Sequence, residues 1–257
     1  MSLTSDRGTT GTTNSAWRTR KPTSPLCRNA LLTRIRMSFK ILRAHYDILP
    51  QAQQKVLREL GKLPTGFVLY GGTAIALHLG HRSSIDFDFF SSENYQFDYV
   101  KASLSFLGTQ EILQAEANTL TLLVNEPDWV KLSFFWNITT GRIAPPMRLE
   151  RENILVASLE DLLAHKLKTI FERIEIKDYI DVAAILREGL SLQRGLEGAL
   201  ALWWDLPAME ALRALTYFQG ADFEHLSSED KDILIQASRE VSLDKIEPSP
   251  LDHWSLA

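Results

Sequence analysis

The sequence has one cysteine, no long apolar run and no cluster of cysteine with histidine. Cys27 stands alone among 257 residues, which excludes an internal disulfide and a cysteine-based metal site. This usage suits a reducing cytoplasm, which is the location that we expect. Charged residues interrupt every apolar stretch before the roughly 18 to 20 residues that a membrane helix needs, so we expect no membrane span. The 45% apolar content is enough for a sizeable core and a soluble globular protein.

Positive charge is concentrated at the N-terminus. Residues 1–36 hold seven basic groups and one acid, a net charge of +6, whereas the whole chain carries −4 and the rest therefore −10. The segment is rich in Ser, Thr and Gly and lacks an apolar period, so we expect disorder. Three interpretations remain open: a basic arm for nucleic acid, a transit peptide, and an extension ahead of a true start at Met37. We favour the extension, because the first patterned segment begins at Met37.

From Met37 the apolar pattern predicts an α+β fold. Helices are expected over residues 51–60, 73–79 and 95–107, and strands over residues 67–70, 85–90, 111–116, 120–124 and 129–136. Only helices follow, over residues 158–174, 178–187, 192–203, 208–218 and 228–240. We therefore divide the chain into an extension (1–36), a mixed core domain (37–157) and a helical domain (158–257).

Two carboxylates stand one residue apart on an otherwise apolar strand. Asp86 and Asp88 share one face of the strand expected over residues 85–90, while Phe87 and Phe89 share the other. Their Cα atoms would lie roughly 6.6 Å apart, close enough for both side chains to reach one divalent ion or a pair of ions. Hard oxygen ligands favour magnesium, which keeps several waters and binds substrate phosphates. An ordinary half-exposed strand would show the same alternation.

A glycine pair precedes the aspartates. Gly71 and Gly72 follow a strand and precede a helix, so the backbone can approach a ligand closely and the helix N-terminus offers free amides to phosphate. The hydroxyl of Thr73 could add a hydrogen bond. Simple turn chemistry would also explain the glycines. The order of the two motifs is more specific than either, because one short helix and a return strand would bring them together.

These motifs resemble a known signature. Gly71-Gly72-Thr73 followed by Asp86-Phe87-Asp88 resembles the signature of the nucleotidyltransferase superfamily with the polymerase-β-like fold. The segments LYGGTAIALHLGHRSSIDFDFF and SLEDLLAHKLKTIFERIEIKDYIDVAAIL resemble the AbiEii/AbiGii toxin group, the toxin half of bacterial abortive-infection and toxin–antitoxin pairs. The similarity runs from about residue 50 to residue 190. It implies a polymerase-β-like nucleotidyltransferase core, a mixed sheet flanked by helices, followed by a helical C-terminal lobe.

The resemblance also implies a reaction. A hydroxyl attacks the α-phosphate of an NTP such as ATP or GTP, the nucleotide is transferred and pyrophosphate leaves, with Mg²⁺ or Mn²⁺ stabilising the attacking and leaving oxygens. Related toxins are understood to add nucleotides to RNA, tRNA acceptor ends in particular. An RNA or tRNA acceptor and a cognate antitoxin are therefore partners that the family alone implies.

The second segment carries basic side chains at the border of an apolar helix stripe. Lys166 and Arg173 lie seven residues apart along one edge of that stripe. The resemblance implies that Lys166 supports the triphosphate, and we group Arg173 and Arg82 with it as nucleotide-binding candidates. Side chains that bury their stems and expose their charges would give the same pattern.

An acidic element follows on the next helix. Lys177, Asp178 and Asp181 match a Lys-Asp-x-x-Asp element of the family, which implies that one of the two aspartates completes the active site; we take Asp181 as the catalytic candidate. The structural alternative is an acid favoured by the helix dipole at Asp178, and a salt bridge from Asp181 to Arg173 or Lys177.

One departure affects the expected chemistry. The wider superfamily usually has a third carboxylate on a later strand, and on the strand expected over residues 129–136 Ser133 stands where we would look for it. Serine is not a general base at neutral pH. Asp181 could take over, the acceptor could need little deprotonation, or turnover could be inefficient.

Three classes of function therefore remain. The favoured one is a metal-dependent nucleotidyltransferase toxin. The second is a small-molecule nucleotidyltransferase of the antibiotic-modifying kind, which is not expected to carry the block at residues 158–190. The third is a degenerate, non-catalytic nucleotide-binding protein, which the missing third acid keeps open.

Overall fold

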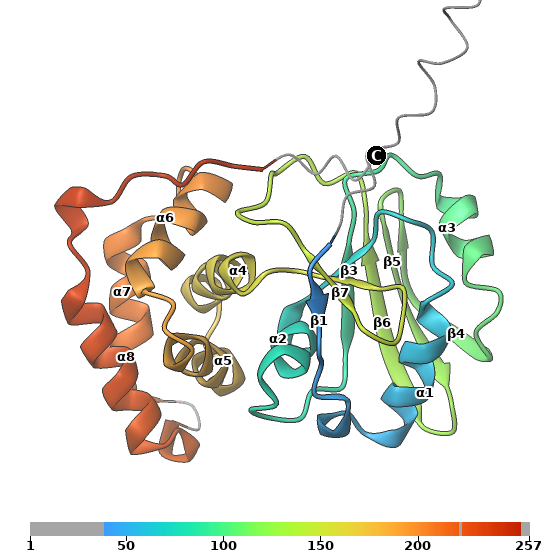
Figure 1. The fold of residues 1–257 in the computed structure, drawn as a ribbon, viewed down its shortest axis with the longest axis horizontal. Helices are drawn as coiled ribbons and strands as arrows, with labels where there is room; N and C mark the ends of the chain where they lie inside the picture. Colours follow the sequence, from blue (N-terminus) through green and yellow to red (C-terminus); the bar gives the residue numbers. More distant parts are fainter. Residues whose placement is uncertain (1–38, 221–222, 253–257) are drawn as a thin grey trace, which may run out of the picture. The chain divides into compact units, whose positions relative to one another are not determined.

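Eight strands form one mixed sheet with helices on both sides (Figure 1). The structure, a computed structural model, describes residues 39–220 and 223–252, which belong to one compact unit. The extension predicted over residues 1–36 lies outside the described residues. The strand order is β1-β7-β8-β2-β3-β6-β5-β4. The strands are β1 Ile41–Leu42, β2 Val68–Tyr70, β3 Phe87–Phe90, β4 Thr109–Glu116, β5 Thr119–Asn125, β6 Trp129–Phe135, β7 Met147–Leu149 and β8 Leu155–Val156.

Eight α-helices occur in the described part of the chain. They are α1 Gln51–Leu60, α2 Gly71–Leu79, α3 Phe97–Ser103, α4 Leu159–Glu172, α5 Ile176–Arg187, α6 Leu192–Leu202, α7 Ala208–Thr216 and α8 Ser228–Glu240. In Figure 1, α1 and α3 lie to the right of the sheet, and α2 and the C-terminal helices lie to its left. Because α2 packs against both α4 and α5, it joins the sheet to the helical region. No helix in residues 39–220 and 223–252 is both long and apolar enough to cross a bilayer.

Pairing at the centre of the sheet places the acidic motif. β3 runs antiparallel to β2 and parallel to β6. On one face, Phe87 and Phe89 are fully buried in the core. On the other face, Asp88 pairs with Tyr70 of β2 and with Ser133 of β6. The strand therefore buries its aromatic side chains and presents its carboxylate on the opposite face, as the alternation predicts.

Serine caps explain where three later helices begin. The side chains of Ser158, Ser191 and Ser227 each accept a hydrogen bond from the backbone amide three residues later, at the starts of α4, α6 and α8. At α4, Asp161 stands where a capping box would have Glu or Gln. Its carboxylate accepts the backbone amides of Ile143 and Ala144 at 2.9 and 3.1 Å, so it fixes an incoming loop as well as the cap.

The main elements match the prediction, with differences at several ends. Two of them affect the site: α2 begins at Gly71 instead of Thr73, and β3 begins at Phe87, which leaves Asp86 just ahead of the strand and Ile85 exposed. The strands β1, β7 and β8 were not predicted, because two or three residues are too few for an alternating pattern. The boundary placed after residue 157 stays a prediction, although the named elements that follow β8 in the described residues are all helices.

Candidate active site

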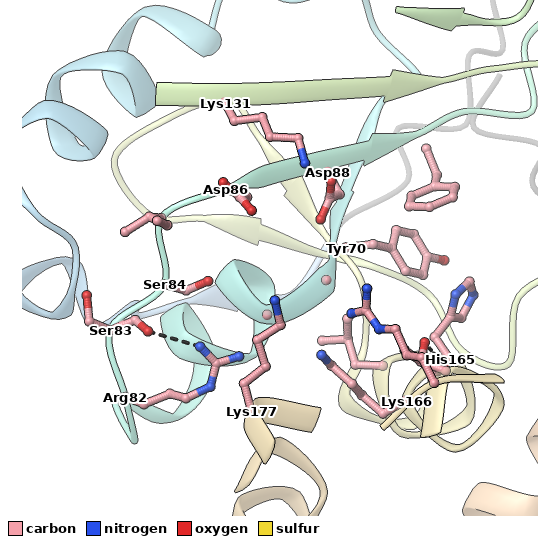
Figure 2. A pocket seen from close by; sticks show the side chains of 17 residues that line it. Tyr70, Arg82, Ser83, Ser84, Asp86, Asp88, Lys131, His165, Lys166 and Lys177 are labelled. Carbon is pink, nitrogen blue, oxygen red and sulfur yellow. Dashed lines mark hydrogen bonds between the residues drawn. The ribbon is translucent and has the colours of Figure 1, made fainter. Parts of the chain in front are cut away.

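A cavity of about 610 Å³ lies over the end of β3, between the sheet and the helices α4 and α5. Its walls come from the glycine motif, the acidic motif and the helical motif together. The lining residues are Tyr70, Gly71, Gly72, Arg82, Ser83, Ser84, Ile85, Asp86, Asp88, Phe90, Lys131, Leu162, His165, Lys166, Thr169, Arg173 and Lys177. Figure 2 shows Asp86 and Asp88 opposite the side chains of Arg82, Lys166 and Lys177.

The two aspartates both line this cavity. Burial, together with the negative charge of Asp86, raises the pKa of Asp88 above the ordinary value, even though a hydrogen bond from Ser133 and the charges of Lys131 and Lys166 oppose the shift. Among the described residues no cation lies within 4 Å of either carboxylate. The pair is therefore a concentration of negative charge that the protein itself leaves incompletely neutralised.

The strand beside the acidic motif carries a serine and a lysine on the site face. Ser133, where a third carboxylate was looked for in the sequence, pairs directly with Asp88. Lys131, two positions earlier on β6, lines the cavity, and no ion-pair partner lies within 4 Å of it in the described residues. Lys131 was not among the predicted site residues, although its spacing from Ser133 puts it on the same face of the strand.

The glycine pair forms the first turn of α2, directly below the carboxylates. Gly71 has φ +74°, a conformation that L side chains rarely adopt. A Cβ at Gly71 would lie 2.7 Å from Oδ2 of Asp88, and one at Gly72 would lie 2.6 Å from Nη2 of Arg82. Both positions line the cavity where helical amides lack intrahelical acceptors. The glycines are thus needed for the turn and for the close approach of the two functional side chains.

A Gly71→Ala variant is expected to lose both stability and nucleotide transfer, for two different reasons. The backbone strain should cost about 1–2 kcal/mol of stability, and the displaced Asp88 carboxylate should lower nucleotide transfer about 100-fold. Gly189→Ala is a matched control, because Gly189 also has positive φ (+88°) but no atom within 4 Å of its added Cβ. Urea denaturation and a transfer assay on both variants provide the comparison. Equal losses of activity in the two variants would contradict this role of Gly71.

Thr73 lies behind the cavity wall. Its side chain is buried, and its hydroxyl contacts the hydroxyl of Ser84 at 2.9 Å and donates to the backbone carbonyl of Asp86. The contact with phosphate predicted for Thr73 would require the hydroxyl to leave both partners. Its observed contacts instead tie α2 to the segment that carries Asp86.

Asp181 lies at the centre of a buried cluster of charged side chains. It accepts hydrogen bonds at 2.7 Å from Nε2 of His81 and, in a bidentate arrangement, from Nε and Nη2 of Arg82. Nζ of Lys166 lies 2.8 Å from Oδ2 of Asp181. Burial alone would raise the pKa of Asp181, but these hydrogen bonds and charges outweigh it and lower the pKa to about 2. A carboxylate so stabilised is a weak base, so its geometry favours positioning over proton transfer.

Asp178 completes the same network. It lies 2.6 Å from Nζ of Lys166 and 3.3 Å from Nε of Arg173, whose guanidinium also contacts Glu175 at 3.0 Å. The structural alternative was a salt bridge from Asp181 to Arg173 or Lys177. Neither pair occurs in the described residues, where both basic side chains contact Glu175 instead. Lys166 lines the cavity as predicted, but its ammonium group is shared between two buried carboxylates. Arg82 and Lys166 are therefore oriented by α5 before any ligand arrives.

Five cationic and two anionic residues line the cavity, which gives it the charge that a polyphosphate requires. The cations are Arg82, Lys131, Lys166, Arg173 and Lys177. Lys177 points toward the cavity in Figure 2, and among the described residues its one ion pair is with the half-exposed Glu175, at 2.8 Å. Two of these cations, Lys131 and Lys177, were not among the predicted binding residues. In the described residues neither forms an ion pair with the buried carboxylates Asp178 and Asp181.

The aspartate pair fits a divalent cation better than it fits any protein partner. A positive ion would reduce the repulsion between the two neighbouring carboxylates, which contributes to the raised pKa of Asp88. Carboxylate oxygen is also the donor that magnesium prefers. No group of three or more His, Cys, Asp or Glu side chains that could hold a metal occurs in the described residues. An ion held here would therefore complete its shell with water and substrate oxygens.

Comparisons with known proteins agree with this arrangement. Residues 55–245 match the family described as nucleotidyl transferase AbiEii toxin, type IV TA system. An uncharacterized protein of Aquifex aeolicus (strain VF5) is 28% identical over 158 residues, which cover 60% of this chain and 75% of that relative.

Two solved structures extend the comparison. The nucleotidyltransferase toxin MenT4 from Mycobacterium tuberculosis H37Rv aligns with a TM-score of 0.51 and 13% identity, over 75% of this chain and 83% of that chain. JHP933 from Helicobacter pylori aligns with a TM-score of 0.47 and 19% identity, over 74% of this chain and 90% of that chain. The likeness to MenT4 shows a shared fold.

Proposed function

The chain belongs to the AbiEii nucleotidyltransferase toxin family, and from this premise we propose that it transfers a nucleoside monophosphate from an NTP to a hydroxyl of RNA, in a reaction that depends on a divalent cation. The observation that carries the proposal is the cavity itself. Asp86 and Asp88 face it without a cation within 4 Å in the described residues, and five basic side chains surround them. A metal-bound triphosphate supplies the charges that this arrangement lacks.

Each part of the site has a defined task in this proposal. Gly71 and Gly72 let the phosphates approach the first turn of α2, and Lys131 and Lys177 neutralise their charge. Asp181 and Asp178 hold Arg82 and Lys166 toward the cavity, so that less conformational entropy is lost when the nucleotide binds. Asp86 and Asp88 are the only carboxylates that line the described cavity, and in this proposal both hold the ion. The attacking hydroxyl would therefore give its proton to water.

Asp86 and Asp88 would hold the divalent ion, for which we propose Mg²⁺, with Mn²⁺ as the alternative. When bound, such an ion neutralises the charge that develops on the phosphate oxygens. The protein contributes the carboxylate pair and the surrounding cations. The family also suggests a toxin–antitoxin role and a cognate antitoxin, which we include in the proposal.

The direct test is label transfer from each of four α-labelled NTPs to total RNA, with Mg²⁺ present. We expect one or more labelled RNA bands with the wild-type chain and none with Asp86→Asn, which keeps the size of the side chain but removes its charge. Addition of a chelator should abolish the label as well. The size of the labelled band would identify the acceptor, and the active NTP would identify the base.

Two results would contradict the proposal in different ways. Transfer of label to a small molecule, with none in RNA, would move the antibiotic-modifying class ahead. Retention of NTP and Mg²⁺ binding without any transfer would favour a degenerate nucleotide-binding protein. The same preparation distinguishes these outcomes if small-molecule products are analysed beside the RNA.

A further inference from the structure

One end of the cavity is aromatic. Tyr70, Phe90 and His165 all line it, and their rings contact one another: the centroids of Tyr70 and Phe90 lie 5.1 Å apart, and those of Tyr70 and His165 lie 4.8 Å apart. Trp203 supports His165 edge-on at 4.9 Å, and Phe135 stacks behind Phe90 at 5.0 Å. We call Tyr70, Phe90 and His165 the aromatic wall. In Figure 2 Tyr70 and His165 lie on the opposite side of the cavity from Arg82.

His165 is the polar member of this wall. Burial lowers the pKa of its imidazole to about 4, so the ring is neutral at pH 7 and has one donor and one acceptor nitrogen. Within residues 39–220 and 223–252 no hydrogen-bond partner is found for either ring nitrogen, although the ring lines the cavity. The ring therefore offers a ligand a flat face and a hydrogen-bonding edge that the protein does not use.

The aromatic wall lies next to the carboxylates in the sheet. Phe90 follows Asp88 by two positions on the same face of β3, so their Cα atoms lie roughly 6.6 Å apart. Tyr70 pairs directly with Asp88 across the sheet. The guanidinium of Arg82 and the ammonium of Lys177 lie at the other side of the cavity (Figure 2). A ligand with a charged end among the cations and a flat, polar-edged ring at its other end would fit both parts.

We propose that Phe90 and His165, supported by Tyr70, bind a nucleobase, namely the base of the incoming NTP, by stacking against its face and by a hydrogen bond from His165 to its edge. This inference rests on the proposed nucleotide substrate and adds the residues that select its base. Stacking of a base on an aromatic side chain is sequence-tolerant, because every base has a flat face. The hydrogen bond of His165 is the part that can distinguish one base from another.

Calorimetric titration of the full chain with each NTP and with inorganic tripolyphosphate, in Mg²⁺, tests the inference without any transfer step. We expect the wild type to bind its preferred NTP about 10-fold to 100-fold more tightly than tripolyphosphate. Phe90→Leu and His165→Leu should remove most of that advantage and leave tripolyphosphate binding unchanged. His165→Phe should keep the affinity for NTPs and reduce the difference among the four bases. Phe171→Leu, on the same helix but outside the cavity, is the matched control.

The outcomes separate this inference from the proposed function. Equal affinities of the wild type for NTP and tripolyphosphate, or an NTP advantage that survives both leucine variants, would overturn the aromatic wall as a base site even if RNA labelling succeeds. Loss of affinity for the RNA acceptor alone in those variants would assign the wall to the acceptor and would overturn the inference for the NTP. A wild-type advantage that the variants remove would support it even if no transfer is detected.

Discussion

An Asp88→Asn variant is expected to lose at least about 1,000-fold in nucleotide transfer without losing stability. A carboxylate that holds a catalytic cation contributes several kcal/mol to the transition state, and each 1.36 kcal/mol is a factor of ten in rate. Asparagine has the same shape but cannot supply the negative charge. Transfer of label from an α-labelled NTP, followed at saturating NTP and Mg²⁺, measures the loss.

The same substitution should leave the metal-free protein as stable as the wild type or more stable. Burial and the neighbouring charge of Asp86 raise the pKa of Asp88, so the ionised carboxylate is less stable in the folded protein than in the unfolded chain. Because an amide carries no charge, this penalty disappears in the variant. A carboxylate whose charge costs stability in the folded protein is typical of a functional site.

Thermal unfolding with chelator and with excess Mg²⁺ checks both parts of this prediction. The wild type should gain stability when Mg²⁺ is added, because the proposed ion would bind the folded state, and Asp88→Asn should not. Asp98→Asn is a suitable control: it removes an exposed acid on α3, outside the cavity. A variant that is much less stable than the wild type in chelator would show that Asp88 has a structural role.

The acidic motif could be located from the sequence, because its signals are local. The alternation around Asp86 and Asp88, together with the glycines at the start of the preceding helix, specifies a strand, a short helix and a turn, and these elements are present in the structure. These inferences need only the period of an element and the order of elements along the chain. Ser133 was singled out by the family resemblance, and its pairing with Asp88 is known only from the structure.

The partners of the charged side chains could not be predicted in this way. Arg82 and Asp181 are about 100 positions apart, and their bidentate contact depends on how α5 packs against α2. The hydroxyl of Thr73 has nearby partners that periodicity does not reveal. His165 looked unremarkable in the sequence because its role depends on Tyr70 and Phe90, which lie on two other elements. Side-chain identity is local, whereas side-chain environment depends on tertiary packing.

An Asp181→Asn variant should behave in the opposite way to Asp88→Asn and lose about 3–5 kcal/mol of stability. Asp181 is fully buried and neutralises Arg82 and Lys166. Its loss leaves Arg82 without an acidic partner within 4 Å in the described residues and leaves Lys166 with Asp178 alone among them. Nucleotide transfer should fall as well, because Arg82 and Lys166 lose their fixed orientation. Urea denaturation at pH 7 measures the stability, and transfer kinetics should show the larger change in KM for the NTP.

The pH dependence of this loss identifies its electrostatic cause. Because the pKa of Asp181 is about 2 in the folded protein, below the ordinary value of 3.8, its charge stabilises the fold fully above about pH 4. As the pH falls further, the unfolded chain binds the proton first, and the contribution is lost by about pH 2. The difference in unfolding free energy between wild type and variant should therefore be constant from pH 7 to pH 5 and should narrow below pH 4.

A second variant shows whether burial is the reason for this effect. Glu175→Gln also removes one acid from an ion pair beside the cavity, but the Glu175 side chain is 37% exposed and its partner Lys177 is 51% exposed. Water screens such a pair, so the expected cost is at most about 1 kcal/mol. If both variants lost the same free energy, charge pairing in general would explain the result. If only Asp181→Asn lost several kcal/mol, the cause would be the burial of this carboxylate and of the ion pairs that it forms. The contacts that position Arg82 and Lys166 for a nucleotide would then also stabilise the packing of α5 against α2.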